Sequence, residues 1–380
     1  MPPHVPQELI AAIIDRLKDD RESLIQCNSA SKVLHEEAQR HLFAKIWIHN
    51  RRPLLLWARD FADKSKHARI LKVSDPEAFR EKLSTKEIDF ILSFRLLDAL
   101  SLYTENPNPN FSFFHGLSKD TLKTLHLSLG NHTTQLSGVL GLILSFPRLQ
   151  NLKVVCHGSL EGPLSHVYCW HIPPLDGTLF LYGPIKPIAS ILFNFQFYFT
   201  TIHLNLSASD FKLVQRIVNR CSGTLTSLSI GWLDGDMSTF PLASVLTSAS
   251  LLLPDTPQPI LSLGGIEKGL DRLALRSWWP TPVWMFHILS TIPIPLKTRI
   301  FLHPTSEVVN LSPPDVALWE QFDEMLYDVG DAVVNYEDIT LGDTVKKLFP
   351  KLEEKRRVRW KDKQGIYGST GSASAQRTFP

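Results

Sequence analysis

The sequence predicts an α/β protein with two parts, a short helical module at the N-terminus and a long array of strand–helix repeats behind it. Three observations predict this: an amphipathic helical pattern at the start, Leu-x-Leu strand patterns at nearly equal spacing, and apolar segments of helical length between them. The chain has 380 residues, of which 43% are hydrophobic and 21% charged, so it can build a large core and more than one folding unit.

The N-terminal segment predicts three short helices. Pro6 stands where a first helical turn tolerates proline, and one apolar face follows it. That face comprises Leu9, Ile10, Ile13, Ile14 and Leu17. Two more helices follow, one around Ile25 and one from about Ser29 to His41. Helices this short cannot bury all their apolar surface among themselves, so we expect them to pack against a partner or the next domain.

Strand patterns of the form Leu-x-x-Leu-x-Leu, or near variants, recur through the rest of the chain. Their central residues are Leu100, Leu125, Leu152, Leu179, Ile202, Leu228, Leu273 and Ile300. Successive centres lie 25, 27, 27, 23, 26, 45 and 27 residues apart, and six of these gaps fall within the period of leucine-rich repeats. The longest gap fits an inserted or doubled unit around the Pro-rich segment from Leu253 to Gly265.

Apolar segments of helical length fill most of the gaps between these strands. They are Leu136 to Phe146, Pro187 to Phe199, Ser209 to Cys221 and Thr281 to Ile292. One strand and one helix per unit, stacked on a shared core, make a solenoid. Regular leucine-rich repeats carry an Asn or Cys after the strand; its absence here indicates an irregular solenoid. The alternative is an ordinary α/β domain in which Leu-x-Leu strands recur by chance.

A cap is expected at the C-terminal end of the array, to cover its last apolar face. Val316 to Val329 predicts a closing amphipathic helix, and Arg357 to Trp360 a last strand. The segment after Gly365 is rich in Gly, Ser, Ala and Thr, which is typical of disorder. The expected organisation is a helical module at 1–48, a repeat domain with its cap at 49–363, and a tail at 364–380.

Composition and charge argue against several classes of protein. The net charge is +2, so no global field favours nucleic acid or an anionic membrane. Four cysteines do not make a disulfide framework, and no signal peptide or membrane-spanning apolar run is evident. We therefore expect a soluble protein of the cytoplasm, the nucleus or both.

The N-terminal residues form a pattern that is also found in a known family. It consists of Val5-Pro6-Gln7-Glu8-Leu9-Ile10, Ile13-Ile14, Leu17, Ser23-Leu24, Cys27, Ser31 and Leu42-Phe43. This pattern resembles the F-box, and Ile46-Trp47-Ile48 resembles the strand that follows it in fungal F-box proteins. The C-terminal pattern of Trp319, Phe322-Asp323, Leu326 and Phe349-Pro350-Lys351-Leu352 is similar to that of the same group.

The resemblance implies a substrate receptor of an SCF-type ubiquitin ligase, with no catalytic residues and no cofactor of its own. Its helices would bind a Skp-type adaptor and, through it, a cullin scaffold, while the repeats would hold a protein target. The adaptor-binding candidates are Pro6, Leu9, Ile13, Ile14, Leu17, Leu24 and Cys27. Ser29, Ala30 and Leu34 stand where the family usually has leucine, valine and tryptophan. These departures predict weakened adaptor binding.

Target-binding candidates flank the strand leucines, which are expected to point inward. They are Lys123, His126, Lys153, His203, Ser229, Arg272 and Arg276. A one-residue error in register would invert this face. The alternative function is a repeat scaffold that binds a partner without any ubiquitin ligase.

Three further groups of residues bear on metal binding, catalysis and nucleic-acid binding. Cys156, His157, His166, Cys169 and His171 lie close in sequence, but they lack a Cys-x-x-Cys pair, so we expect a structural role and no metal. No nucleophile or phosphate-loop motif occurs, although an enzyme with a diverged α/β core is an alternative. The basic cluster between Lys346 and Lys363 is interrupted by acids; we expect a solvated edge rather than a nucleic-acid or nuclear-import site.

Overall fold

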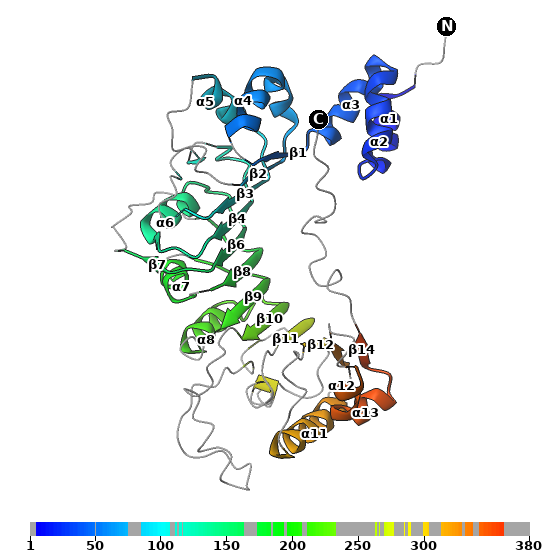
Figure 1. Ribbon diagram of the computed structural model, residues 1–380, viewed down its shortest axis with the longest axis vertical. Helices are drawn as coiled ribbons and strands as arrows, with labels where there is room; N and C mark the ends of the chain where they lie inside the picture. Colours follow the sequence, from blue (N-terminus) through cyan, green and yellow to red (C-terminus); the bar gives the residue numbers. More distant parts are fainter. Residues whose placement is uncertain are drawn as a thin grey trace. The chain divides into compact units, whose positions relative to one another are not determined.

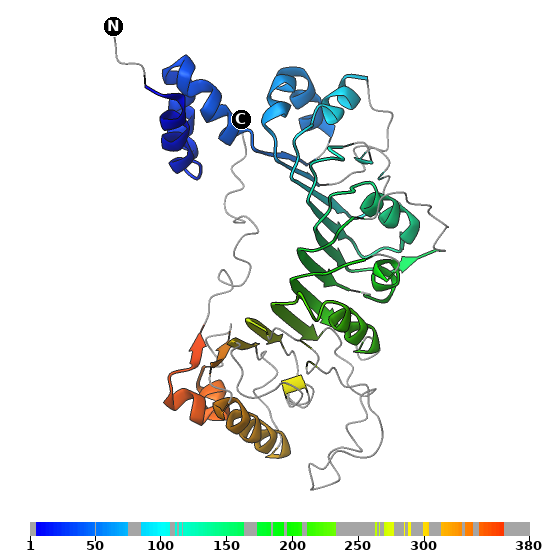
Figure 2. The ribbon, with the colours of Figure 1, turned by 180° about the vertical axis from the view of Figure 1, so that it is seen from behind.

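The computed structural model divides the chain into two units, Met1–Thr200 and Thr201–Pro380, and each is described by itself (Figures 1 and 2). The residues that the structure describes are 5–49, 51–74, 85–106, 111, 114–115, 117–162, 173–183, 185–193, 196–206, 211–232, 263, 266, 270–276, 285, 288–289, 299–303, 313–328, 331–336 and 342–360.

Three helices open the first unit: α1 (Gln7–Arg16), α2 (Arg21–Ala30) and α3 (Lys32–Leu42). The second and third begin at side-chain caps. The Asp20 carboxylate accepts the Ser23 backbone N–H at 3.1 Å, and the Ser31 hydroxyl accepts that of Leu34 at 3.2 Å. A small core is shared by Ile10, Ile14, Leu24 and Ala38. The three helices predicted from the sequence are thus observed.

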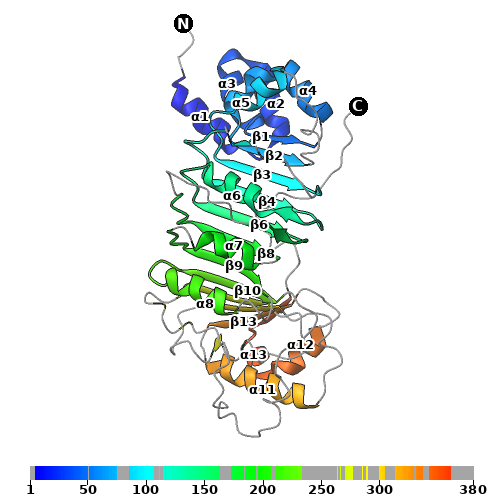
Figure 3. The same cartoon turned by 90° about the vertical axis from the view of Figure 1, so that its left-hand side faces the viewer.

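Six parallel strands follow in the first unit, and their spatial order is their order along the chain. They are β1 (Lys45–Ile48), β2 (Ile70–Ser74), β3 (Ala99–Thr104), β4 (Thr124–Leu129), β6 (Asn151–Cys156) and β8 (Thr178–Tyr182). The helices between them are α4 (Arg51–Asp60), the 3-10 helix Ala62–His67, α5 (Thr85–Leu92) and α6 (Leu136–Leu144), and α7 (Ile185–Leu192) follows β8. A separate short pair joins β5 (Thr134–Gln135) and β7 (Leu160–Glu161). Figure 3 shows α6 and α7 in front of the larger sheet.

Burial alternates along the strands of this sheet. In β4 the burial pattern places Leu125, Leu127 and Leu129 in the core, while the residues between them are half-buried. The same alternation holds in β2, β6 and β8. Because side chains alternate between the two faces of a strand, one face packs its leucines against the helices and the other faces solvent. The inward direction predicted for the strand leucines is confirmed.

A recurring pair of backbone hydrogen bonds precedes the strands. The carbonyl oxygen of Ala44 accepts the N–H groups of Arg69 and Ile70, each at 2.9 Å. In the same way, the Arg69 carbonyl accepts the N–H groups of Asp98 and Ala99. The Asp98 carbonyl accepts those of Lys123 and Thr124. The Lys123 carbonyl accepts those of Gln150 and Asn151, and all six distances lie between 2.8 and 3.1 Å. Each carbonyl therefore holds the start of the next strand in register.

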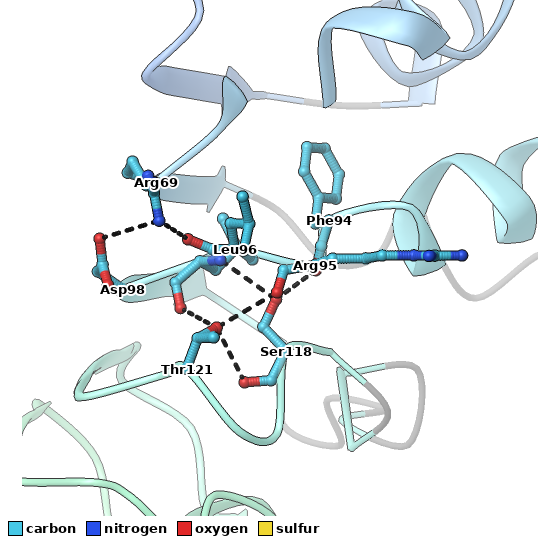
Figure 4. Close-up of polar contacts among 8 residues, drawn as sticks. Arg69, Phe94, Arg95, Leu96, Asp98, Ser118 and Thr121 are labelled. Atoms are coloured by element: carbon cyan, nitrogen blue, oxygen red, sulfur yellow. Dashed lines mark hydrogen bonds and ion pairs between the residues drawn. The ribbon is translucent and has the colours of Figure 1, made fainter. Parts of the chain in front are cut away.

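Side chains reinforce these backbone bonds in the loops before β3 and β4 (Figure 4). The Arg69 guanidinium donates to the Leu96 carbonyl at 3.2 Å. The Thr121 hydroxyl donates to the Leu97 carbonyl at 2.8 Å, and the Ser118 hydroxyl accepts the Leu97 N–H at 3.2 Å. Polar groups of these loops thus find partners in the neighbouring loop, as buried backbone requires.

The second unit also contains parallel strands in chain order. They are β9 (Thr201–Leu206), β10 (Ser227–Trp232), β11 (Arg272–Arg276), β12 (Arg299–His303), β13 (Ala332–Tyr336) and β14 (Val358–Trp360). Its helices are α8 (Phe211–Arg220), α11 (Pro313–Asp328), α12 (Gly342–Leu348) and α13 (Pro350–Glu354). The Thr226 carbonyl accepts from Asp271 at 2.8 Å and from Arg272 at 3.2 Å, which repeats the pattern of the first unit.

The aromatic and acidic residues of the C-terminal sequence pattern contact one another in this unit. Both oxygens of the buried Asp323 carboxylate accept backbone N–H groups at the start of α13, from Lys351 at 2.7 Å and from Leu352 at 3.1 Å. The Trp319 ring lies edge-on to Phe322 and Phe349, with centroid distances of 5.8 and 5.3 Å. The closing helix and last strand expected from the sequence are both present.

All eight Leu-x-Leu patterns form strands, and the helices expected near 136, 187 and 209 are observed. The strands β2 and β13 were not predicted. β1 lies within the range 1–48 expected for the module but pairs with β2, so the sheet begins at Lys45. Most of the expected insertion at 253–265, most of the helix at 281–292 and the tail at 364–380 lie outside the described residues.

Core truncation and surface truncation in β4 should have very different effects. Leu125 is fully buried, so Leu125→Ala should lower the free energy of unfolding by about 2–5 kcal/mol through loss of packing. Lys123→Ala, at an exposed side chain next to the same strand, should change it by less than about 0.5 kcal/mol. Urea denaturation of both variants measures the difference, and equal losses would contradict the packing described here.

Candidate functional site

The apolar stripe of α1 is divided between the core of the helical module and solvent. Ile10 and Ile14 are buried against the other helices, whereas Leu9 is 52% exposed and Ile13 is 50% exposed. Leu9 and Ile13 are four residues apart and therefore neighbours on the helix surface. Ile25 in α2 is 48% exposed and Val33 in α3 is 58% exposed. We refer to Leu9, Ile13, Ile25 and Val33 together as the exposed apolar residues of the module.

The structure separates the predicted adaptor-binding residues into three groups. Pro6, Leu9 and Ile13 are exposed, and Leu17 and Cys27 are half-buried. Ile14 and Leu24 lie in the module's core, at 0% and 2% exposure, so these two side chains hold the helices together and are not surface contacts. The sequence did not show which residues of α1 are buried, because Leu9, Ile10, Ile13 and Ile14 form one continuous apolar stripe.

The departures from the family pattern also differ in position. Ser29 and Ala30 are exposed near the end of α2, where the Ser29 hydroxyl donates to the Ile25 carbonyl at 3.1 Å. Leu34 packs against the module's core and is half-buried. The small residues at 29 and 30 therefore reduce apolar area on the outside of the module, while its core is complete without them.

The solvent face of the first unit's sheet carries a row of side chains aligned by strand register. Trp47 pairs with Lys72, Lys72 with Ser101, Ser101 with His126, His126 with Lys153, and Lys153 with Phe180. We refer to these six residues as the central row. Trp47 is exposed, Ser101 is buried, and the other four are half-buried.

Contacts along the central row combine cations with aromatic rings. The Lys72 ammonium lies 6.0 Å from the Trp47 ring centroid, and the Lys153 ammonium lies 4.7 Å from that of Phe180. Both distances are within the range of cation–π attraction. Tyr103 lies beside the row, two residues beyond Ser101 on β3. Its hydroxyl is 3.2 Å from Nδ1 of His126, within hydrogen-bond distance.

The electrostatic environment of the row is positive. Burial, together with the charges of Lys153 and Lys72, lowers the pKa of His126 to about 3. Burial and Lys72 also lower the pKa of Lys153. His126 is consequently neutral at physiological pH, and the two ammonium groups supply the charge of the row.

The predicted target-binding residues lie in both units. Lys123 is exposed just before β4, and His126 and Lys153 lie in the central row. In the second unit His203 and Ser229 are half-buried and paired in register, and Arg272 is exposed. The side chain of Arg276 lies outside the described residues. The sequence did not single out Trp47, Lys72 and Phe180, which occupy equivalent positions on neighbouring strands, or Tyr103, which lies two residues beyond Ser101 on β3.

The other constellations show little convergence. Cys156 is buried and His157 is exposed, and His166, Cys169 and His171 lie outside the described residues. Within the described part of the chain, no group of three or more His, Cys, Asp or Glu side chains has metal-binding geometry. In the C-terminal basic cluster, Lys351 forms an ion pair with Glu324 at 2.7 Å and Lys346 with Glu353 at 3.3 Å. No helix among the described residues has both the length and the apolar character needed to cross a membrane.

No protein-family model matches the chain, and no curated protein matches its sequence. What the structure itself defines is a mixed α/β protein with parallel strands and a helical module at its start.

Acid should destabilise the protein through His126. Its pKa is about 3 when folded and near 6.5 when unfolded, so between these pH values the unfolded chain binds a proton that the folded chain does not. The contribution of His126 therefore lowers the free energy of unfolding as the pH falls below about 6.5. His126→Gln should reduce the loss between pH 7 and 4.5 by about 1–2 kcal/mol, a value discounted for partial exposure.

Urea denaturation at both pH values measures this effect. His132→Gln, at an exposed histidine, is the matched control and should leave the pH dependence as it is in the wild type. A wild-type pH dependence in the His126→Gln variant as well would contradict the burial of a neutral imidazole.

Proposed function

We propose that this chain is a substrate-recognition subunit of an SCF-type ubiquitin ligase. Its N-terminal module would be an F-box that binds a Skp-type adaptor, and the adaptor would connect it to a cullin scaffold. The observation that carries the proposal is the pair of exposed apolar residues Leu9 and Ile13, beside a core that is already complete. An apolar helix face of this kind is what helix-in-groove association uses.

The parallel strands support the second half of the proposal, an irregular leucine-rich-repeat solenoid. In each unit the strands follow the chain order, and within the first unit one carbonyl oxygen accepts two N–H groups before β2, β3, β4 and β6. The buried leucines alternate with outward residues in β4, β6 and β8. Stacked repeats that share a core have these properties, and their strand face commonly binds a partner.

The proposed role is recognition without catalysis. The residues offered to the target are polar and aromatic side chains on the strand face, and the chemistry of ubiquitin transfer would belong to the recruited enzyme. The site of action would be the cytoplasm, the nucleus or both.

One observation favours a second candidate, a repeat scaffold that works without a ligase. Ser29 and Ala30 are exposed, so apolar area is missing where the family usually presents leucine and valine. Each 1.4 kcal/mol of lost binding energy weakens affinity about tenfold. Adaptor binding is therefore proposed to be weaker, by about one power of ten or more, than for a receptor that matches the pattern.

Titration with a purified Skp-type adaptor distinguishes the two candidates. The full chain should bind, and Leu9→Glu with Ile13→Glu should abolish binding, because two charges would be buried in an apolar contact. The melting temperature should stay near that of the wild type, since both side chains are exposed. Isothermal titration calorimetry and thermal melts provide the two measurements.

Leu92→Glu with Leu96→Glu is the matched control, because these leucines are 51% and 40% exposed but lie outside the module. This control should bind the adaptor as the wild type does. If neither the wild type nor a variant with the restoring changes Ala30→Val and Leu34→Trp binds, the ligase proposal fails and the scaffold replaces it.

A further inference from the structure

The strands of the first unit's sheet have an unusual charge composition. Across β1, β2, β3, β4, β6 and β8 there is no aspartate, glutamate or arginine, whereas three lysines occur, at 45, 72 and 153. The whole chain has a net charge of only +2, so the acids that balance these lysines lie elsewhere. The solvent face of this sheet therefore carries positive charge of local origin.

Lys72 and Lys153 are held in place by aromatic rings instead of carboxylates. Their ammonium groups lie near the rings of Trp47 and Phe180, at 6.0 and 4.7 Å. A ring attracts a cation through its quadrupole but does not neutralise the charge. Among the described residues, neither lysine forms an ion pair with an acid.

Two described acids in the adjoining loops have neighbours of their own. Asp98 precedes β3 and lies 4.0 Å from the Arg69 guanidinium. Glu105 follows β3 and lies against Gly130, where its carboxylate leaves no room for a Cβ atom. Among the described residues, the charged groups that act on His126 and Lys153 are lysines, so an anion placed over His126 would be attracted from both sides.

We propose that the central row binds a carboxylate-rich, extended segment of a partner protein. Lys72 and Lys153 would pair with Asp or Glu side chains of that segment, and Trp47 and Phe180 would contact its apolar parts. The inference rests on the proposed function, because it gives the chemistry of the target that the repeats would hold.

Carboxylates fit this face better than phosphates do. Recognition of phosphorylated residues relies on arginine, whose planar guanidinium offers two parallel donors, and the six strands contain none. Nucleic-acid binding uses many phosphate contacts, whereas two half-buried ammonium groups supply few. Rings and hydroxyls between the cations, at Tyr103 and Ser101, suit a peptide of mixed polarity.

An extended segment fits because the row crosses the strands. Its six residues come from six neighbouring strands, each about 4.8 Å from the next, so a ligand that reaches both lysines must run across the sheet. Lys72 and Lys153 are three strands apart, and the side chains between them at Ser101 and His126 are short or flat. A linear peptide can follow such a path, with its acidic side chains directed to the two ends.

A phage-displayed library of random dodecapeptides, panned on the full chain, tests the proposal. Selected sequences should be enriched in Asp and Glu by at least about threefold over the input. Their affinity, measured by fluorescence anisotropy, should fall at least about tenfold in the Lys72→Gln/Lys153→Gln variant. Lys86→Gln, at an exposed lysine on α5, is the matched control and should stay within twofold of wild type.

A charge reversal keeps the test valid if affinity is low. Lys153→Glu should shift selection away from acidic peptides and toward basic ones, while circular dichroism and the melting temperature report that the fold is intact. Selection without acidic enrichment, enrichment that survives in the double variant, or no selection at all would overturn the proposal. So would a clear preference for phosphoserine peptides or for a single-stranded dodecanucleotide in the same anisotropy assay.

Adaptor titration separates this result from the proposed function. The Lys72→Gln/Lys153→Gln variant should bind a Skp-type adaptor like wild type, because the substitutions lie outside the helical module. Loss of peptide binding with adaptor binding intact supports the central row. If adaptor binding is absent while peptide selection succeeds, the ligase role fails and the central row remains as the binding surface of a scaffold.

Discussion

The paired backbone hydrogen bonds before the strands set the register on which the first unit depends. A carbonyl such as that of Arg69 or Asp98 accepts two N–H groups from the residues at the start of the next strand, so β2, β3, β4 and β6 each start opposite the strand before them. Register decides which side chains are buried, because a slip of one residue exchanges the two faces of a strand. The leucines in the core and the aligned central row are both consequences of this single constraint.

Loop lengths can vary under this constraint because it acts at the start of each strand and not on the segment before it. The residues between successive strands form a ten-residue helix in α4, a nine-residue helix in α6 and an eight-residue helix in α7. Side-chain bonds such as that from Thr121 to the Leu97 carbonyl stabilise the loops individually. The strands can thus form a regular face although the segments between them differ in length. A binding surface is most easily built on that strand face.

Local sequence pattern predicted the strands that are rich in leucine, since Leu-x-Leu reports burial on one face of a strand. The strands β2 and β13 were not predicted, because their core positions hold Val73 and Val334 and lack the repeated leucine pair. The sequence also predicted the apolar stripe on α1, but not which of its residues are buried. The packing of the other helices decides that Ile14 is buried and Ile13 is exposed. The central row depends on pairing between strands 25 or more residues apart, which no local pattern contains.

Two surfaces of different chemistry follow from this architecture. The exposed apolar residues of the module would suit an apolar groove, and the central row is proposed to bind an anionic partner, so the two would not compete for one ligand. Such a separation suits a protein that connects one partner to another.

Hydrogen–deuterium exchange of the full chain, alone and with a Skp-type adaptor, tests the central claim most directly. The account predicts slower exchange on adaptor binding in the module's helices between Gln7 and Leu42, with β3, β4 and β6 unchanged. Protection confined to the strands, with none in α1, would contradict it.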